Sequence, residues 1–397
     1  MSSEWAYAKL GELTVNLDKR RKAVKEPDRK PGPYPYYGAS GIVDYVDGYL
    51  FEGPHLLIAE DGENLRTRQT PIAFMADGKF WVNNHAHIVI GNEKASTKFL
   101  LYALLGTDIS AYLSGAVMPK LTQANLNRIE VPCPPRNLQD QIVGILGALD
   151  DRITLLRETN KTLEAIAQAV FKSWFVDFDP VRAKMEGRQP EGMDEATAAL
   201  FPDSFEESEL GLVPKGWRVG TVQDLVVLQR GFDLPTVKRS KGKYPVIAAS
   251  GPSGTHHTEM ARGPGIITGR SGVLGKVFLT LEDYWPLNTT LWVKEFRLAT
   301  PTFAYELLKT LDFHSLNAGS AVPTLNRNHV HSLPQILPDI KCVHNYEEIA
   351  MPLHKRAHQN SKQIALLEAL RDTLLPRLIS GQLRLSEAQE QIENALT

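Results

Sequence analysis

The chain has 397 residues, of which 43% are hydrophobic and 23% are charged, and its formal net charge at pH 7 is −2. A chain of this size and composition is globular and long enough for two or three domains. It has neither the long apolar run of a membrane-spanning helix nor the apolar centre of a secretory signal, so we expect a cytoplasmic protein. Because Cys133 and Cys342 are the only cysteines, a disulfide framework or a cysteine-based zinc site is not expected.

The chain repeats itself once. The segment LEAIAQAVFKSWF (163–175) resembles LEALRDTLLPRLI (367–379), and three other pairs precede it in the same order. These pairs are YPYYGASG (34–41) with YPVIAASG (244–251), WVNNHAHIV (81–89) with WPLNTTLWV (285–293), and GAVMPKL (115–121) with GSAVPTL (319–325). Chance similarity between helical segments would not preserve this order, so the sequence predicts a tandem duplication.

Each copy begins with short apolar runs separated by Gly and Pro, which indicate strands and short helices, and each ends in a long helix. We predict α/β domains over 1–137 and 216–343, long helices over 138–180 and 344–385, an exposed linker over 181–215 and a polar tail over 386–397. The first helix and the linker together are acidic, whereas the second α/β domain is basic, which permits contact with phosphates.

The first long helix has apolar residues at alternating steps of four and three, which is the spacing of a coiled-coil seam. The candidate seam residues are Leu149, Ile153, Leu156, Asn160 and Leu163, with Asn360, Ile364 and Leu367 on the second helix. We expect the helices to run antiparallel, with the two asparagines at one level to set the register. The predicted fold is therefore α+β, with two homologous α/β domains in tandem, two long antiparallel coiled-coil helices between them, and pseudo-two-fold symmetry.

The sequence offers no catalytic constellation. The segment GVLGKV (272–277) lacks the first Gly and the final Ser or Thr of a phosphate-binding loop, and neither a nucleophile elbow nor a zinc-protease motif occurs. His85 and His87 lack a carboxylate or cysteine at suitable spacing, so no metal site is expected. We therefore expect a chain without catalytic residues of its own.

Two similar domains on antiparallel helices suit duplex DNA, where dimeric proteins read two half-sites. Glu60 in AEDG (59–62) corresponds to Arg270 in GRSG (269–272), and such a charge reversal would favour different bases, although solvated loop charges would look the same. The candidate DNA-binding residues are Glu60, Arg66, Arg68 and Lys120 in the first domain and Arg230, Lys243, Arg270, Ser271, Lys276 and Arg327 in the second.

The segments PPRNLQDQIVGILGALDDRITLLRETNKTLEAIAQAVFKSWFVDFDPVRAK (134–184) and LEALRDTLLPRLISGQL (367–383) resemble the conserved regions of type I restriction-modification specificity subunits. This resemblance implies a non-catalytic subunit that reads an asymmetric bipartite DNA site with one domain per half-site. It also implies two modification subunits that form an adenine-N6 methyltransferase, and restriction subunits that add an ATP-dependent nuclease. S-adenosylmethionine, ATP and Mg²⁺ would then belong to the partner subunits, and Trp174 and Phe175 would contact a modification subunit.

The alternative is a coiled-coil scaffold whose paired domains bind proteins instead of DNA. The two functions differ in their dependence on salt, because DNA binding releases counterions and weakens steeply as the salt concentration rises.

Overall fold

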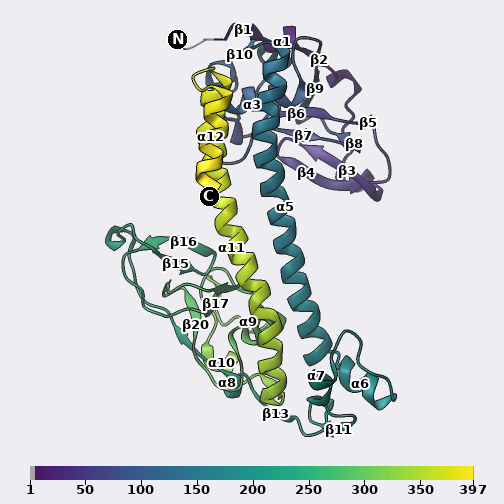
Figure 1. Cartoon of the computed structure of the whole chain (residues 1–397), viewed down its shortest axis with the longest axis vertical. Helices are drawn as coiled ribbons and strands as arrows, with labels where there is room; N and C mark the ends of the chain where they lie inside the picture. Colours follow the sequence, from purple (N-terminus) through teal and green to yellow (C-terminus); the bar gives the residue numbers. More distant parts are fainter. Residues whose placement is uncertain (1–4, 320, 397) are drawn as a thin grey trace. The chain divides into compact units, whose positions relative to one another are not determined.

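The computed structural model describes residues 5–319 and 321–396, and it mixes α-helices and β-sheets (Figure 1). The chain divides into two compact units, each with its own sheets and with part of two long helices. Unit 1 comprises Met1–Leu155 and Gln363–Thr397, whereas unit 2 is the continuous segment Leu156–Lys362. None of the helices in the described ranges combines the length and the apolar character that a membrane crossing requires.

Unit 1 is built on a main antiparallel sheet of order β2–β9–β6–β7, with strands Thr14–Asn16, Ala86–Gly91, His55–Ala59 and Ala73–Ala76. A second sheet of order β4–β3–β8–β5 contains Gly41–Val46, Pro31–Gly38, Lys79–Val82 and Phe51–Glu52, and its β3 and β8 are parallel. The remaining elements are β1 (Tyr7–Lys9), β10 (Glu130–Pro132), α1 (Leu10–Leu13), α2 (Asn64–Thr67), α3 (Thr97–Gly106) and α4 (Gln123–Arg128). Every residue of β6 is buried, as expected for an inner strand covered on both faces.

Unit 2 repeats this design. Its main antiparallel sheet has the order β14–β20–β17–β18, with strands Val226–Arg230, Thr290–Phe296, Gly265–Gly269 and Val277–Thr280. A smaller sheet of order β16–β15–β19 contains Gly251–His256, Tyr244–Ala248 and Trp285–Pro286, and its β15 and β19 are parallel. The other elements are β13 (Arg218–Thr221), β21 (Pro334–Leu337), α8 (Val222–Leu225), α9 (Pro301–Thr310) and α10 (Arg327–His331).

The same backbone hydrogen bonds close a Gly-containing turn in both units. Leu121 N donates to Glu60 O over 2.8 Å in unit 1, and Leu325 N donates to Arg270 O over 2.8 Å in unit 2. The two units therefore share their strand order and their turns, as a duplicated chain predicts. The pseudo-two-fold relation between them stays a prediction.

The two long helices are α5 (Arg136–Phe175) and α11 (Ile340–Ile379), which contribute to both units and run antiparallel (Figure 1). In unit 2, Tyr346 Oη donates to Ala167 O over 3.1 Å and Asn360 Nδ2 donates to Asn160 Oδ1 over 2.9 Å. Asn360 is only 2% exposed, so this polar pair lies inside the seam at one level. The apolar seam residues are buried or half-buried, namely Leu149, Ile153, Ile364 and Leu367 in unit 1 and Leu156 and Leu163 in unit 2.

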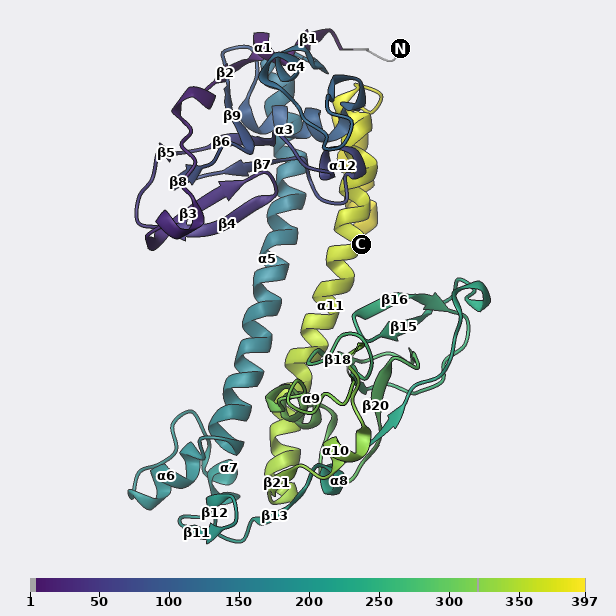
Figure 2. The same cartoon turned by 180° about the vertical axis from the view of Figure 1, so that it is seen from behind.

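Helix α9 packs between the main sheet of unit 2 and α11 (Figure 2). Thr302 N at its start donates to Glu347 Oε2 over 3.0 Å, and the ring of Tyr305 lies edge-on to the ring of His354 at 5.4 Å. His354 is 7% exposed, and its Nε2 has no hydrogen-bond partner among the described residues. Burial, with a contribution from the charge of Lys309, lowers the pKa of His354 to about 4.

This buried histidine predicts a pH-dependent stability. The ordinary pKa of His354 is about 6.5, so its neutral form stabilises the fold fully above that pH, and stability falls as the pH drops from about 6.5 towards 4. The loss is at most about 3 kcal/mol. Urea unfolding at pH 7.0, 5.5 and 4.5 should show a smaller acid loss in His354→Phe than in the wild type, whereas His344→Phe, at an exposed position of α11, should leave the acid loss unchanged. Equal acid losses in the wild type and His354→Phe would contradict this account.

Two segments depart from the sequence-based expectation. The prediction of an exposed linker over 181–215 is wrong, because this segment forms α6 (Asp179–Met185, which begins two residues earlier), α7 (Glu195–Ala199), β11 (Phe205–Ser208) and β12 (Gly211–Pro214). Its Pro and Gly residues mark the turns, while Val181 and Phe201 are buried in the core of unit 2. The segment predicted as a polar tail over 386–397 forms helix α12 (Leu385–Leu396), which buries Ala388 completely, while residue 397 lies outside the described residues.

Trp174 and Phe175 are also placed differently from the prediction that they contact a partner subunit. They are 7% and 8% exposed and lie in the core of unit 2. The ring of Trp174 lies 5.2 Å from that of Phe201, and the ring of Phe175 lies 4.9 Å from that of Phe303. The apolar face at the end of α5 is covered by the unit's own residues, so the partner-contact assignment is wrong.

Candidate nucleic-acid interface

Three of the predicted DNA-binding arginines line one pocket of unit 2. Arg230 ends β14, Arg270 follows β17 and Arg327 begins α10. The pocket has a volume of about 360 Å³, and we call it the arginine pocket. It is lined by Arg230, Arg270, Leu291, Ala318, Thr324, Leu325, Asn326 and Arg327. The antiparallel turns bring together cationic side chains that lie far apart in the sequence.

The backbone around Arg270 is held on both sides. Arg270 N donates to Thr289 O over 2.8 Å, and Ser271 N donates to the same oxygen over 3.0 Å. Gly272 then turns the chain with a φ of +89°, a conformation that favours glycine. The Arg270 side chain is half-buried, and Nη1 lies 3.5 Å from Asn288 O. A half-buried arginine on a fixed backbone presents its donors in a restricted set of directions.

The strand register identifies the equivalent positions in unit 1. In unit 2, Arg230 lies opposite Leu291 where β14 pairs with β20. In unit 1, Asp18 lies beside His87 at the end of the equivalent pair, β2 with β9. Glu60 is equivalent to Arg270, because the backbone carbonyl of each accepts a hydrogen bond from a leucine N–H. The leucine is Leu121 in unit 1 and Leu325 in unit 2. Two acidic residues therefore occupy the positions that two arginines occupy in unit 2.

These acidic residues belong to a charged network inside unit 1. Asp18 Oδ2 lies 2.6 Å from His87 Nδ1, and Glu60 Oε2 accepts from Arg21 Nη1 over 2.8 Å. Lys120 Nζ lies 3.4 Å from the other Glu60 oxygen. Burial raises the pKa of Asp18, but the hydrogen bond and charge of His87, with smaller contributions from Ile88 N and Arg21, outweigh burial and hold it below its usual value.

The predicted role of Glu60 needs revision in the light of this network. Arg21 and Lys120 each bind one of its carboxylate oxygens, so Glu60 is largely neutralised within unit 1 instead of standing free to accept from a cytosine. Lys120 is half-exposed beside it. The sequence did not reveal Asp18, Arg21 and His87 as site residues, because only the fold brings these positions together. Nearby, Nδ1 of the exposed His85 lies 2.8 Å from Oδ2 of Asp61.

Arg66 and Arg68 mainly bind backbone carbonyls. Arg66 Nη2 donates to Gly115 O over 2.9 Å and so holds the exposed loop that closes over Gly62. Arg68 donates to Leu105 O over 3.3 Å and to Thr107 O over 2.5 Å, at the end of α3. A cation at a helix C-terminus complements the helix dipole. The geometry gives Arg68 a structural role, and its assignment as a DNA contact stays a prediction.

The remaining predicted cations of unit 2 lie outside the arginine pocket. Lys243 is exposed, and its Nζ lies 4.8 Å from the centre of the Tyr244 ring. Lys276 is exposed on the turn between β17 and β18. Ser271 pairs with Thr324 through an isolated β-bridge at the pocket's edge. A search of the described residues finds no cluster of three or more His, Cys, Asp or Glu that could hold a metal ion.

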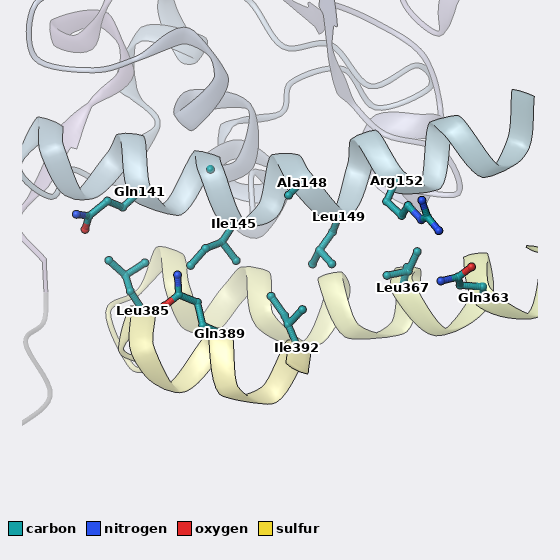
Figure 3. Close-up of a pocket in the computed structure, with 11 residues that line it drawn as sticks. Gln141, Ile145, Ala148, Leu149, Arg152, Gln363, Leu367, Leu385, Gln389 and Ile392 are labelled. Carbon is teal, nitrogen blue, oxygen red and sulfur yellow. The ribbon is translucent and has the colours of Figure 1, made fainter. Parts of the chain in front are cut away.

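Unit 1 also has an apolar groove on its helices. It has a volume of about 800 Å³ and lies between α5, α11 and α12 (Figure 3). Ile145 and Leu149 of α5 face Leu385 and Ile392 of α12 across it, with Leu367 of α11 beside them (Figure 3). A groove of this kind is suited to an amphipathic helix. The sequence does not indicate this groove, because the polar composition of 386–397 predicts a tail instead of a packed helix.

The known proteins that resemble this chain are specificity subunits of type I restriction-modification systems. The family model described as "Type I restriction modification DNA specificity domain" matches residues 2–165. The chain is 43% identical over 147 residues to a putative type I restriction enzyme specificity subunit, S.HindORF215P, of Haemophilus influenzae, which covers 37% of this chain and 38% of that protein. It is 25% identical to the MjaIX specificity subunit of Methanocaldococcus jannaschii, over 97% of this chain and 94% of that one. Its fold resembles the crystal structure of a type I restriction-modification S subunit from M. genitalium, with a TM-score of 0.64 and 17% identity over 96% of this chain and 97% of that one.

Proposed function

The chain belongs to the family of type I restriction-modification specificity subunits, and from this premise we propose that it recognises an asymmetric bipartite sequence in duplex DNA, with one half-site for each unit. The observation that carries this proposal is the charge reversal between equivalent sites. Asp18 and Glu60 in unit 1 stand where unit 2 has Arg230 and Arg270. One site presents a cluster of arginines and the other a network of paired charges on the same backbone frame, so the two sites favour different bases and the two half-sites differ.

We further propose that catalysis belongs to partner subunits. Two modification subunits would supply the methyltransferase with S-adenosylmethionine, and restriction subunits would supply the nuclease with ATP and Mg²⁺. The apolar groove between α5, α11 and α12 is the surface of unit 1 that best suits a helix of a modification subunit. A DNA target places the assembly in the cytoplasm.

Exchange of one domain tests the DNA-reading function. The full chain, produced with its modification subunits in a host free of adenine methylation, should methylate one asymmetric bipartite sequence. Replacement of residues 216–343 by the matching domain of a relative should change one half of that sequence and leave the other half intact. A change in both halves, or in neither, would contradict one half-site per unit.

Salt dependence separates this function from that of a protein scaffold. The complex should bind its own duplex far more tightly than a scrambled duplex, and its affinity should fall steeply as NaCl rises from about 50 to 200 mM. Binding that ignores both sequence and salt would instead favour a scaffold.

A further inference from the structure

We propose that the arginine pocket of unit 2 binds the major-groove edge of a guanine, with Arg270 as the base-reading residue. This inference rests on the proposed function and deepens it, because it names one base of the half-site that unit 2 reads. In this arrangement the Arg270 guanidinium donates to guanine O6 and N7. Arg230 and Arg327, at the margins of the pocket, bind the flanking phosphates.

The geometry of Arg270 distinguishes it from the other two arginines. Its backbone N–H and carbonyl are both used within the unit, by Thr289 and Leu325, and its side chain is half-buried. Arg230 and Arg327 are exposed, and Arg230 Nη2 lies 3.6 Å from Asp233 Oδ1. A side chain that recognises a base must hold its donors in a defined direction. A side chain that contacts a phosphate needs only a positive charge and sufficient length. Arg270 therefore suits the base and its neighbours suit the backbone.

The chemistry of the lining selects an acceptor-rich ligand. Three guanidinium groups line the pocket, and no carboxylate occurs among the described residues that line it. Guanine presents two acceptors, N7 and O6, in the spacing of an arginine fork. Adenine would turn its N6 amino group, and cytosine its N4 amino group, towards a guanidinium, placing donor against donor. Leu291, Leu325 and Ala318 give the same pocket apolar walls, which limit competition from water.

Unit 1 has different residues at the equivalent positions. Glu60 stands where Arg270 would be, held by Arg21 and Lys120, and Asp18 stands where Arg230 would be. The only arginine of this network, Arg21, is already held by Glu60, Asp18 and Ala86 O, so the network offers no open guanidinium fork to guanine O6 and N7. The proposed guanine contact therefore belongs to the half-site of unit 2, and the asymmetry of the recognised sequence has a residue-level cause.

The test compares Arg270→Gln and Arg270→Lys with Arg218→Gln in the full chain bound to its modification subunits. Arg218 is an exposed arginine on β13 of the same unit that does not line the pocket, so its replacement changes the charge equally. Binding is measured by fluorescence anisotropy on the recognised duplex and on all single substitutions of the half-site of unit 2. The same measurement uses a duplex with 7-deazaguanine, which lacks N7, at each guanine of that half-site. Thermal melting verifies that each variant is folded.

Arg270→Gln should lose about 10- to 100-fold in discrimination at one G·C pair and keep its preferences elsewhere. 7-Deazaguanine at that pair should weaken the wild type and have little effect on Arg270→Gln. Arg270→Lys should keep most of the affinity but little of the discrimination, because the fork is lost. An equal loss of affinity for all sequences would identify a phosphate contact and overturn the assignment, as would wild-type discrimination in Arg270→Gln. If the wild-type complex itself selects no sequence, the proposed function fails together with this inference.

Discussion

Replacing Trp174 with alanine should lower the free energy of unfolding of unit 2 by about 3–5 kcal/mol. Trp174 is 7% exposed, and its ring packs edge-on against Phe201 and Phe175, with centroids 5.2 and 6.1 Å away. It also contacts Tyr346 of α11 at 6.4 Å, so the side chain joins both long helices to the segment that follows α5. Its removal leaves a cavity among aromatic rings that the neighbouring backbone cannot easily close.

Urea unfolding followed by circular dichroism measures the loss, and hydrogen exchange assigns it to peptides of unit 2. Ile166→Ala is the matched control, because Ile166 lies on α5 in the same unit but is 45% exposed and should cost little. A partner-contact role for Trp174 makes the opposite prediction. In that case Trp174→Ala would unfold like the wild type and would lose only its binding to a modification subunit.

The sequence predicts those features of the fold that follow from the spacing of its apolar residues and from its repeated segments. The four-and-three spacing of Leu149, Ile153 and Leu156 indicates the seam of α5 because a helix places these positions on one face. The repeated segments likewise indicate two copies of one domain. The same apolar spacing does not tell which part of the helix faces a sheet of its own unit and which part faces a partner, so Trp174 was assigned to the wrong surface.

The candidate site was predictable only in part. Comparison of the two copies singled out Glu60 and Arg270, because both follow a buried strand and precede a glycine. It did not connect Asp18 with His87, because these two residues come together only through the pairing of β2 with β9. Whether a charged residue is free or paired depends on such long-range contacts. This explains why the sequence offers Glu60 as a free carboxylate whereas the fold neutralises it.

Replacing Asp18 with alanine should destabilise unit 1 by about 3–5 kcal/mol, since it removes one partner of a buried charged group. Asp18 accepts from Ile88 N over 2.9 Å and lies 2.6 Å from His87 Nδ1, while His87 Nε2 lies 2.7 Å from Leu121 O. Both ring nitrogens of His87 thus face oxygen acceptors, one on the Asp18 carboxylate and one on the backbone of Leu121. Without that carboxylate, His87 Nδ1 loses its partner in a site that is 1% exposed.

The double variant separates the cost of the unpaired His87 Nδ1 from the cost of the lost packing. His87→Leu introduces the side chain that unit 2 has at the equivalent position, so Asp18→Ala combined with His87→Leu should cost less than Asp18→Ala alone. Asp28→Ala, at an exposed position, is the matched control.

The pKa of Asp18 is held below its usual value of about 3.8, so the stability that its carboxylate contributes is complete above that pH and is lost as the pH falls below it. Urea unfolding at pH 7 of the wild type, the two single variants and the double variant measures these differences. If the double variant is instead as unstable as the sum of the two single variants, the contact between Asp18 and His87 adds no stability beyond the packing of each side chain.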